Sequence, residues 1–352
     1  MSIAESQRPE SIFPQETLRK PSVVFGTYLP EKILTNQEIE SWNVLTPNGN
    51  ILTADNIQKR TGVAKRYVAD STETPLTMGL SAAQQVLNGK KADVIIVSTS
   101  FPVGFNVSQR ISEELGLSPQ SHLDVHAACS GFTLSLAYIK EHEQEFLGKK
   151  ILFVAAEKYS PYLHDLRSPG INTDPSLAQT IFSDGAIAMV FEYGKDLKVI
   201  SAINKEDFPE DTKDCIKMPI DKSLLTSPFL EIPVLYPASE KFEQDGPRVY
   251  KLMCENIPPL IKETIRNSGV DPSTIQMIAP HQGSGHMVDG ISQRLNGYSV
   301  YNDFEEGNFS SASIPKALNV AIKKGEIKKG NIVVLAGFGA GLFASVAVVK
   351  LG

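Results

Sequence analysis

The stretch IVVLAGFGAGLFASVAVV, residues 332 to 349, carries no charged side chain over 18 positions. That length lies at the lower limit of a membrane-spanning helix. Three glycines, Gly337, Gly339 and Gly341, interrupt it, and β-branched residues are common on both sides of them. Glycine is unfavourable inside a helix, whereas apolar β-branched residues favour a buried strand. The stretch therefore predicts two buried strands joined by a glycine turn, and no membrane span.

Segments of similar pattern occur twice in the chain, in the same order. The matched pairs are 92–98 with 274–280, 108–110 with 292–294, Cys129 with Asn308, and 150–154 with 331–335. Their members are about 180 positions apart, and nearly constant spacing is typical of an internal repeat. The closing strands, 186–191 and 343–349, also match in character. We therefore predict two halves, residues 20–195 and 196–352.

The alternation of strand and helix within each half predicts an α/β fold with mixed sheets covered by helices. Two such halves placed face to face form a layered pseudo-dimer. The helices in the middle of the stack should be small and uncharged, as the segment after Cys129 is. Residues 40–75 and 200–245 are polar, contain proline and interrupt the repeat, so we expect insertions over the mouth of a site.

The overall composition is that of an ordinary globular protein. The chain has 352 residues and a formal net charge of -6, which disfavours nucleic acid as a partner. The three cysteines, Cys129, Cys215 and Cys254, match no zinc spacing, so we expect no metal site. The first 20 residues lack the apolar core of a secretion signal, and we expect a cytoplasmic protein.

Cys129 lies in HAACSGF, residues 126–132, at the start of a predicted helix. Backbone N–H groups and the helix dipole at that position favour a thiolate nucleophile. The alternative is a buried structural cysteine, which is the commoner role of a free cysteine. Cys215 and Cys254 lack this setting, and we interpret both as non-catalytic.

His281 and Asn308 are the other candidate catalytic residues. His281 directly follows the buried strand ending at Pro280, where functional loops of α/β proteins lie. Asn308 could simply cap a helix. Its position in the repeat, however, matches Cys129, so a pseudo-twofold axis should place it opposite the cysteine, with His281 beside both.

A cysteine, a histidine and an asparagine suit either a protease-like triad or a thioester enzyme. In a thioester enzyme Cys129 accepts an acyl group, while His281 and Asn308 donate hydrogen bonds to a second thioester. As that second substrate loses CO2 its carbonyl becomes an enolate, which two aimed donors stabilise. The carbanion then attacks the acyl-cysteine and forms a carbon–carbon bond.

Nearly the whole chain resembles the β-ketoacyl-ACP synthase III group of the thiolase superfamily. The matching segments are GTYLP (26–30), KRTGV (59–63), ACSGF (128–132), FSDGA (182–186), PHQ (280–282), GNFSSASIP (307–315) and GFGAG (337–341). The resemblance implies a thiolase-like fold with duplicated βαβαβαββ halves, stacked as an α-β-α-β-α five-layer sandwich. It also implies an acyltransferase acting on acyl thioesters, without a metal or redox cofactor. The backbone N–H groups of Cys129 and Ala340 would form an oxyanion hole.

The resemblance further implies a homodimer and an acidic acyl carrier protein as partner, which needs a local basic face. Arg248 and Lys251 are candidates, and Lys251 matches a family docking lysine. The cluster Lys323, Lys324, Lys328 and Lys329 is a third candidate, or simply a solvated helix face.

The substrate-binding positions depart from the family pattern. Ser284 and His286 stand where the family has an asparagine and an arginine. Arg60 is retained, but the tryptophan that should stack on coenzyme A is replaced by Asn56, and the single tryptophan is Trp42. The second stacking arginine is missing, with Ser176 near its place. We therefore expect a specialised relative that takes its acyl group from a carrier protein or an unusual CoA ester.

Two alternatives stay open. One is an acyltransferase or thioester hydrolase that uses Cys129 without decarboxylation, possible because such an enzyme does not need Asn308. The other is a non-catalytic partner subunit of a heterodimeric synthase, although such subunits generally lose the cysteine.

Overall fold

The structure of the chain is a computed structural model. It describes residues 20–46, 49–87, 89, 91–100, 106–167, 178–219, 232–233, 238–239 and 241–352.

Two β-sheets form the framework of the molecule. The first has the strand order β1-β7-β6-β4-β5-β10 and the second β13-β14-β15-β8. The strands of the first are β1 (Val24–Tyr28), β4 (Val94–Ser98), β5 (Ser121–His126), β6 (Lys150–Glu157), β7 (Gly185–Glu192) and β10 (Ile232–Pro233). Those of the second are β8 (Leu197–Lys205), β13 (Ile275–Pro280), β14 (Ile332–Gly339) and β15 (Phe343–Leu351).

The two sheets have the same topology. In the first, β1 pairs antiparallel with β7, β7 antiparallel with β6, and β6 parallel with β4. In the second, β8 pairs antiparallel with β15, β15 antiparallel with β14, and β14 parallel with β13. At the place of β5, Val300 forms a parallel bridge to Ile278 of β13. The predicted duplication is confirmed. The predicted boundary between residues 195 and 196 lies in the turn between β7 and β8.

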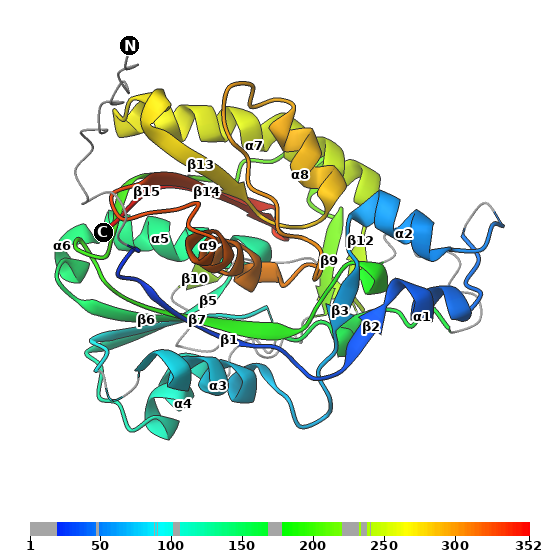
Figure 1. Cartoon of the computed structure of the whole chain (residues 1–352), viewed down its shortest axis with the longest axis horizontal. Coiled ribbons are helices and arrows are strands. Elements are labelled where there is room, and N and C mark those ends of the chain that lie inside the picture. Colours follow the sequence, from blue (N-terminus) through cyan, green and yellow to red (C-terminus); the bar gives the residue numbers. More distant parts are fainter. Residues whose placement is uncertain are drawn as a thin grey trace, which may run out of the picture.

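Helices fill three layers around the sheets, so the predicted five-layer sandwich is confirmed (Figure 1). The helices α5 (Gly131–Glu141) and α9 (Ser313–Lys323) lie between the sheets. One outer face is covered by α3 (Pro75–Leu87) and α4 (Val107–Glu114), and the other by α7 (Gly246–Ser268) and α8 (Gly285–Ser292). Helix α5 is buried at eight of its 11 positions, which explains its small, apolar sequence.

The glycine-rich stretch 332–349 forms β14 and the first part of β15, paired antiparallel from Ile332↔Lys350 to Gly339↔Phe343. This confirms the two predicted strands. Within the described ranges, no helix combines the length and the apolar character that crossing a membrane requires.

The remaining elements lie mainly at one end of the sandwich, on the right of Figure 1. They are β2 (Ile33–Thr35), α1 (Asn36–Ser41), α2 (Ala54–Thr61), β3 (Lys65–Tyr67), β9 (Ile216–Pro219), β11 (Ala238–Ser239) and β12 (Glu243–Gln244). Helix α6 (Glu143–Phe146) follows α5. The 3-10 turns are η2 (Ala128–Ser130), η3 (Ser160–Tyr162), η4 (Ala178–Thr180), η5 (Glu210–Thr212), η7 (Pro272–Thr274) and η8 (Ser310–Ala312).

The predicted insertion at 200–245 began too early in the chain. Residues 200–205 belong to β8, which pairs with β15 and forms an edge of the second sheet. Only one side of an edge strand is paired, so its half-exposed residues include polar ones and look like a loop in the sequence. The insertion at 40–75 is anchored through Gly62. Its φ is 73°, and an added Cβ would lie 2.2 Å from the Phe304 ring.

Candidate active site

Cys129 lies in the 3-10 turn η2, between strand β5 and helix α5. The preceding Ala128 has a left-handed backbone, with φ of 41°, which is strained for a residue with a side chain. The helix begins at Gly131, where a Cβ would lie 1.9 Å from the Ser98 Oγ. The glycine of HAACSGF is therefore required for close packing of the helix start against β4.

The second half contains an equivalent turn, η8, which leads from a left-handed Ser310 (φ of 49°) into α9. When Ala128 is matched with Ser310, Cys129 corresponds to Ser311, and Asn308 lies three residues before Ser311. The predicted equivalence of Cys129 and Asn308 was therefore wrong. The small-residue pattern shared by both helix starts does not specify their register, whereas the backbone conformation does.

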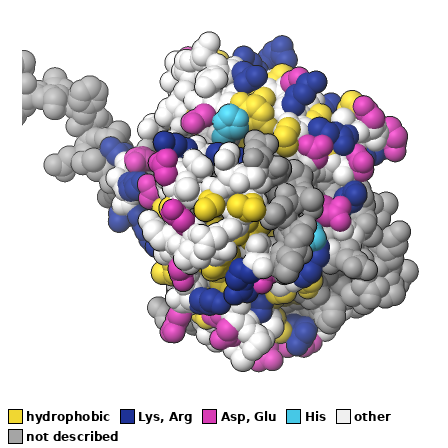
Figure 2. All heavy atoms as spheres, turned by 90° about the vertical axis from the view of Figure 1, so that its right-hand side faces the viewer, with side chains coloured by type: hydrophobic (Ala, Val, Ile, Leu, Met, Phe, Trp, Pro, Cys, Tyr) yellow, Lys and Arg dark blue, Asp and Glu magenta, His cyan; other side chains and the backbone are white. Residues whose placement is uncertain are grey.

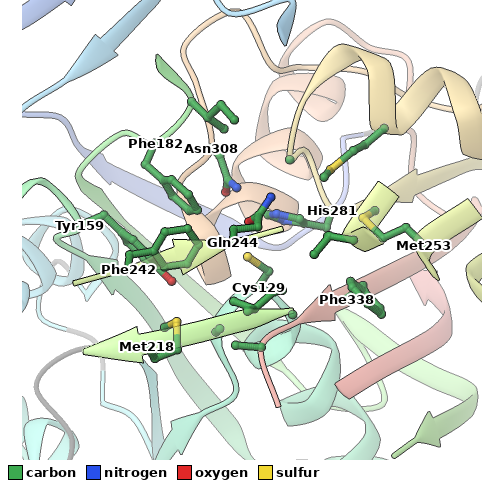
Figure 3. Close-up of a pocket in the computed structure, with 18 residues that line it drawn as sticks. Cys129, Tyr159, Phe182, Met218, Phe242, Gln244, Met253, His281, Asn308 and Phe338 are labelled. Atoms are coloured by element: carbon green, nitrogen blue, oxygen red, sulfur yellow. The ribbon is translucent and has the colours of Figure 1, made fainter. Parts of the chain in front are cut away.

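The structure nevertheless brings Cys129, His281 and Asn308 together. All three line one cavity of about 40 Å³, where their side chains converge (Figure 3). Most of the other lining residues are apolar. They include Tyr159, Phe182, Met218, Phe242, Met253 and Phe338. The Tyr159 and Phe182 rings stack at 4.4 Å and form one wall.

The surroundings of Cys129 favour the thiol, whereas its position at a helix start favours a thiolate. Burial, with a smaller contribution from the charge of Glu157, raises the thiol pKa to about 12. Hydrogen bonding with Ser310 and Asn308 opposes the shift, with Cys129 Sγ 3.7 Å from Ser310 Oγ. Desolvation exceeds the effect of the helix start, so the resting group is a thiol.

His281 is held in place by its backbone N–H, which donates to the Ala336 carbonyl of β14 at 2.7 Å. Within the described residues, its buried Nδ1 has no hydrogen-bond partner. Burial lowers the pKa of the imidazole to about 3. At neutral pH the ring is therefore uncharged and carries one N–H donor.

Asn308 is oriented by the turn that follows it. Its side-chain Oδ1 accepts a hydrogen bond from the Ser310 backbone N–H at 2.7 Å, and its backbone N–H donates to the Ile181 carbonyl at 2.8 Å. Because the oxygen is engaged, the amide NH2 is the group left to face the cavity.

The glycines of β14 allow this strand to approach the cysteine turn. A Cβ at Gly339 would lie 3.0 Å from the Cys129 nitrogen, and one at Gly337 would lie 2.4 Å from Thr133 Oγ1. The next residue, Ala340, is buried and lines the same cavity as Cys129. The two backbone positions predicted for an oxyanion hole are thus brought to one cavity.

A second cavity, of about 550 Å³, adjoins the first and shares Ile181, Gln244 and Met287 with it. Arg60, Ser284 and His286, which were predicted to bind substrate or carrier, all line it. The Ser284 hydroxyl caps α8 by accepting the Met287 N–H, and the His286 ring stacks on Tyr250 at 4.3 Å. The end of the molecule that carries the insertions shows cationic and anionic side chains interspersed (Figure 2).

Neither cavity is lined by the residues that were predicted to form a basic face for the carrier protein, namely Arg248, Lys251 and the lysine cluster. Arg248 is 3.2 Å from Asp214 and also donates to the Asp211 carbonyl, so acidic neighbours offset its charge. The Lys251 side chain is 73% exposed, and its ammonium lies 4.0 Å from Glu255; the preceding residue, Tyr250, lines the second cavity. The cluster Lys323, Lys324, Lys328 and Lys329 precedes β14, whose opposite end carries Gly339 near Cys129. Eight strand residues span about 26 Å, so the cluster does not border the site.

The other predicted positions lie away from the chemistry. Asn56 is exposed on α2, and Trp42 lies 5.3 Å from the Arg167 guanidinium. Cys215 and Cys254 are buried outside the first cavity's lining. Ser176 falls outside the described residues. Those residues contain no cluster of three or more metal-ligating His, Cys, Asp or Glu side chains.

The FSDGA motif has a structural role. The Asp184 carboxylate accepts hydrogen bonds from the backbone N–H groups of Ala69, Tyr159 and Ser160. It therefore holds two loops against β7, and it does not line the first cavity.

One buried acid beside the site, Glu157, was not predicted from the sequence. Glu157, the last residue of β6, is fully buried, and burial raises its pKa to about 7. Its partners are Ser100 and Ser311, which come from opposite halves of the chain. The only signal in the sequence was a carboxylate at the end of an otherwise apolar strand.

Comparison with known proteins agrees with this architecture. Residues 123–207 match the family model described as 3-oxoacyl-[acyl-carrier-protein (ACP)] synthase III, and residues 265–351 match the model of its C-terminal part. The chain is 29% identical over 330 residues to the β-ketoacyl-[acyl-carrier-protein] synthase III of Agrobacterium fabrum, covering 90% of this chain and 94% of that protein.

Two solved structures have the same fold. The 3-oxoacyl-(acyl carrier protein) synthase III of Pseudomonas aeruginosa superposes with a TM-score of 0.76 at 23% identity, covering 95% of this chain and 98% of that one. The priming β-ketosynthase of the R1128 polyketide pathway gives 0.73 at 25% identity, with 97% and 99% coverage. The chain is therefore a β-ketoacyl-ACP synthase III-like enzyme of the thiolase superfamily, and thus an enzyme of the acyltransferase type.

Proposed function

We propose that this enzyme loads an acyl group on Cys129 and extends it by decarboxylative Claisen condensation with a malonyl- or β-ketoacyl-thioester. The observation that carries the proposal is the convergence of the Cys129 thiol, the neutral His281 imidazole and the Asn308 amide on one largely apolar cavity. Two neutral N–H donors facing a buried sulfur suit an enolate that forms beside an acyl-cysteine.

The proposed reaction has two halves. First, the sulfur of Cys129 attacks the donor thioester, and the carbon–sulfur bond to the leaving thiol breaks. The backbone N–H groups of Cys129 and Ala340 stabilise the tetrahedral oxyanion of this step. Next, the carboxylate of a malonyl extender leaves as CO2, and its electron pair moves onto the thioester, whose oxygen accepts hydrogen bonds from His281 and Asn308. The carbanion then attacks the acyl-cysteine, forms the carbon–carbon bond and releases Cys129 as a thiolate, which takes up one proton to restore the thiol.

The adjoining cavity supports a role in substrate delivery. A thioester arm entering past Arg60, Ser284 and His286 reaches the shared residues Gln244 and Met287 before the sulfur. We propose that acyl carrier protein presents at least one substrate here, with Lys251 as a contact at the rim. We assign Arg248 a smaller part, because Asp214 offsets its charge. We also propose a cytoplasmic homodimer that uses no metal or redox cofactor, since the three free cysteines suit a reducing compartment.

Asn308 and Cys129 each favour condensation over one of the two alternatives. An acyltransferase or hydrolase that uses Cys129 does not need a second carbonyl-directed donor, yet the Asn308 amide is held facing the cavity by the Ser310 N–H. A non-catalytic partner subunit would not need the thiol, which the chain retains in the cavity.

Intact-mass detection of acyl adducts, after incubation with a panel of acyl-CoA and acyl-carrier donors, tests loading. Release of CO2 from malonyl-carrier thioester tests condensation. Cys129→Ala should abolish the adduct. Asn308→Ala should slow CO2 release about 10²- to 10³-fold while retaining the adduct. If both variants condensed at the wild-type rate, the assigned roles would be wrong.

A further inference from the structure

A hydrogen-bonded cluster with no part in the mechanism above lies behind the cavity. At its centre is Glu157, whose carboxylate accepts the Ser100 N–H at 2.9 Å and the Ser100 hydroxyl at 3.1 Å. It also accepts the Ser311 N–H at 3.2 Å and the Ser311 hydroxyl. Glu157, Ser100 and Ser310 are each fully buried.

A continuous row of hydrogen bonds connects this carboxylate to the nucleophile. Cys129 Sγ lies 3.7 Å from Ser310 Oγ, to which it donates. Ser310 Oγ lies 3.3 Å from Ser100 Oγ, and either atom can be the donor. Ser100 Oγ donates to Glu157. Every step can therefore run in one direction, from the thiol to the carboxylate.

Tyr159 braces this row from the side. Its hydroxyl donates to Ser100 Oγ at 3.0 Å and lies 3.2 Å from Ser310 Oγ. Its ring forms a wall of the cavity that contains Cys129 (Figure 3). The two serine hydroxyls are thus held in contact within a region that excludes solvent.

We propose that Glu157 accepts the proton of the Cys129 thiol during acyl loading, relayed through the hydroxyls of Ser310 and Ser100. The proposal rests on the proposed function, because it concerns the loading step. As the sulfur–carbon bond forms, the thiol proton moves to Ser310, the Ser310 proton to Ser100 and the Ser100 proton to Glu157. When the bond to the donor sulfur breaks, the leaving thiolate takes a proton from solvent. Glu157 keeps the thiol proton until condensation releases the Cys129 thiolate, which takes that proton back along the same row.

The relay supplies the base that acyl loading requires to remove the thiol proton. Burial keeps Cys129 protonated, and His281, whose pKa burial lowers to about 3, is a weaker base than Glu157. The raised pKa of Glu157, about 7, makes it a better base than an ordinary carboxylate, although the hydroxyl and N–H groups of Ser311 and Ser100 limit the rise. The thiol remains the much weaker acid, so transfer has to accompany bond formation.

The titratable groups that face Glu157 are Cys129 from η2 and Tyr159 from the loop after β6. Gly185 is the strand partner of Glu157, and the residue before it is Asp184. The Asp184 carboxylate binds backbone N–H groups of other residues instead of facing Glu157. In the described part of the chain, Glu157 forms no salt bridge with a lysine, arginine or histidine.

The test measures single-turnover loading of Cys129 by intact mass between pH 5.5 and 9. The donor is whichever of acetyl-, butyryl- and octanoyl-CoA, or their acyl-carrier forms, loads fastest. The relay requires ionised Glu157, so the wild-type rate should rise with pH, bend near pH 7 and then level off. Glu157→Gln should slow loading about 100-fold at pH 7.5 and remove the bend.

Two further variants separate the relay from a structural role of Glu157. Ser310→Ala interrupts the row but leaves all four hydrogen bonds from Ser100 and Ser311 to the carboxylate, and it should slow loading as Glu157→Gln does. Ser311→Ala keeps the row but removes a hydrogen bond that favours the charged carboxylate, so the bend should move to higher pH. Ser112→Ala, at a buried serine on α4 bonded to the Leu117 carbonyl, is the matched control and should load normally.

The outcomes are distinguishable. Absence of any adduct on the wild-type enzyme with every donor overturns the proposed function itself. Normal wild-type loading, with Glu157→Gln and Ser310→Ala retaining the bend, overturns the relay alone. If Glu157→Gln does not fold, wild-type loading in mixtures of H2O and D2O decides. A curved dependence of rate on deuterium fraction supports transfer of several protons, whereas a rate independent of deuterium refutes it.

Discussion

Replacement of His281 by glutamine should make the protein more resistant to acid. The buried imidazole has its pKa lowered to about 3 in the folded state, against 6.5 for a solvated histidine. As the pH falls below 6.5 the unfolded chain binds a proton that the folded chain refuses, so stability is lost. Between pH 7.5 and 5.0 this linkage removes about 2 kcal/mol of the free energy of unfolding. His281→Gln has no such proton to bind and should avoid the loss.

The same calculation gives the opposite sign for Glu157. Its pKa is raised from 4.5 to about 7, so the folded state binds a proton before the unfolded state does. Acidification from pH 7.5 to 5.0 then stabilises the wild type by about 2 kcal/mol through this group. Glu157→Gln should lose that gain, and the two variants should diverge in opposite directions from the wild type.

The assay is urea denaturation at pH 7.5 and 5.0, followed by circular dichroism. His286→Gln, which removes an exposed imidazole stacked on Tyr250, is the matched control for the loss of a histidine. The His286→Gln variant should lose as much unfolding free energy as the wild type between pH 7.5 and 5.0. If His281→Gln lost that same amount, the His281 imidazole would not be buried in its neutral form. Its role as an uncharged hydrogen-bond donor would then fall as well.

Three other perturbations test the packing and charges around the site. Gly337→Ala places a methyl group 2.4 Å from Thr133 Oγ1, so it should cost about 1–3 kcal/mol in urea denaturation and impair acyl loading. Gly246→Ala, where an added methyl group meets no atom within 4 Å, should leave the free energy of unfolding unchanged. Lys316→Met leaves two carboxylates, now 2.8 and 3.2 Å from the ammonium, without their buried partner and should lower the free energy of unfolding by about 3–5 kcal/mol in the same assay. Lys251→Glu should raise the KM for a carrier-bound substrate about threefold to tenfold at low salt, whereas Lys329→Glu, at the far end of β14, should leave that KM unchanged.

Local patterns predicted the parts of this protein that depend on nearest neighbours. The apolar β-branched runs of β14 and β15 are strands because their side chains pack within sheets, and α5 carries no charge from Gly131 to Ile139 because it lies between two sheets. The repeat of these patterns was enough to predict a duplicated fold. The ordered motifs around Cys129, His281 and Asn308 were enough to select these three residues.

The register and the charges of the site were not predictable in the same way. The equivalence of Cys129 with Asn308 was wrong by three residues, because small residues begin both central helices and only the left-handed turns at Ala128 and Ser310 align them. The expected thiolate at Cys129 is a thiol, because burial there has a larger effect than the start of a helix.

By itself, then, the sequence determined the two halves, the strand and helix order and the identity of the three converging side chains, since these follow from periodicity and residue type. Only the tertiary structure decided their protonation states and the connection of Cys129 to Glu157. Protonation depends on how much water each group loses and on which partners approach it. Ser100 and Ser310, which make that connection, are more than 200 positions apart in the chain and meet only when the halves pack together.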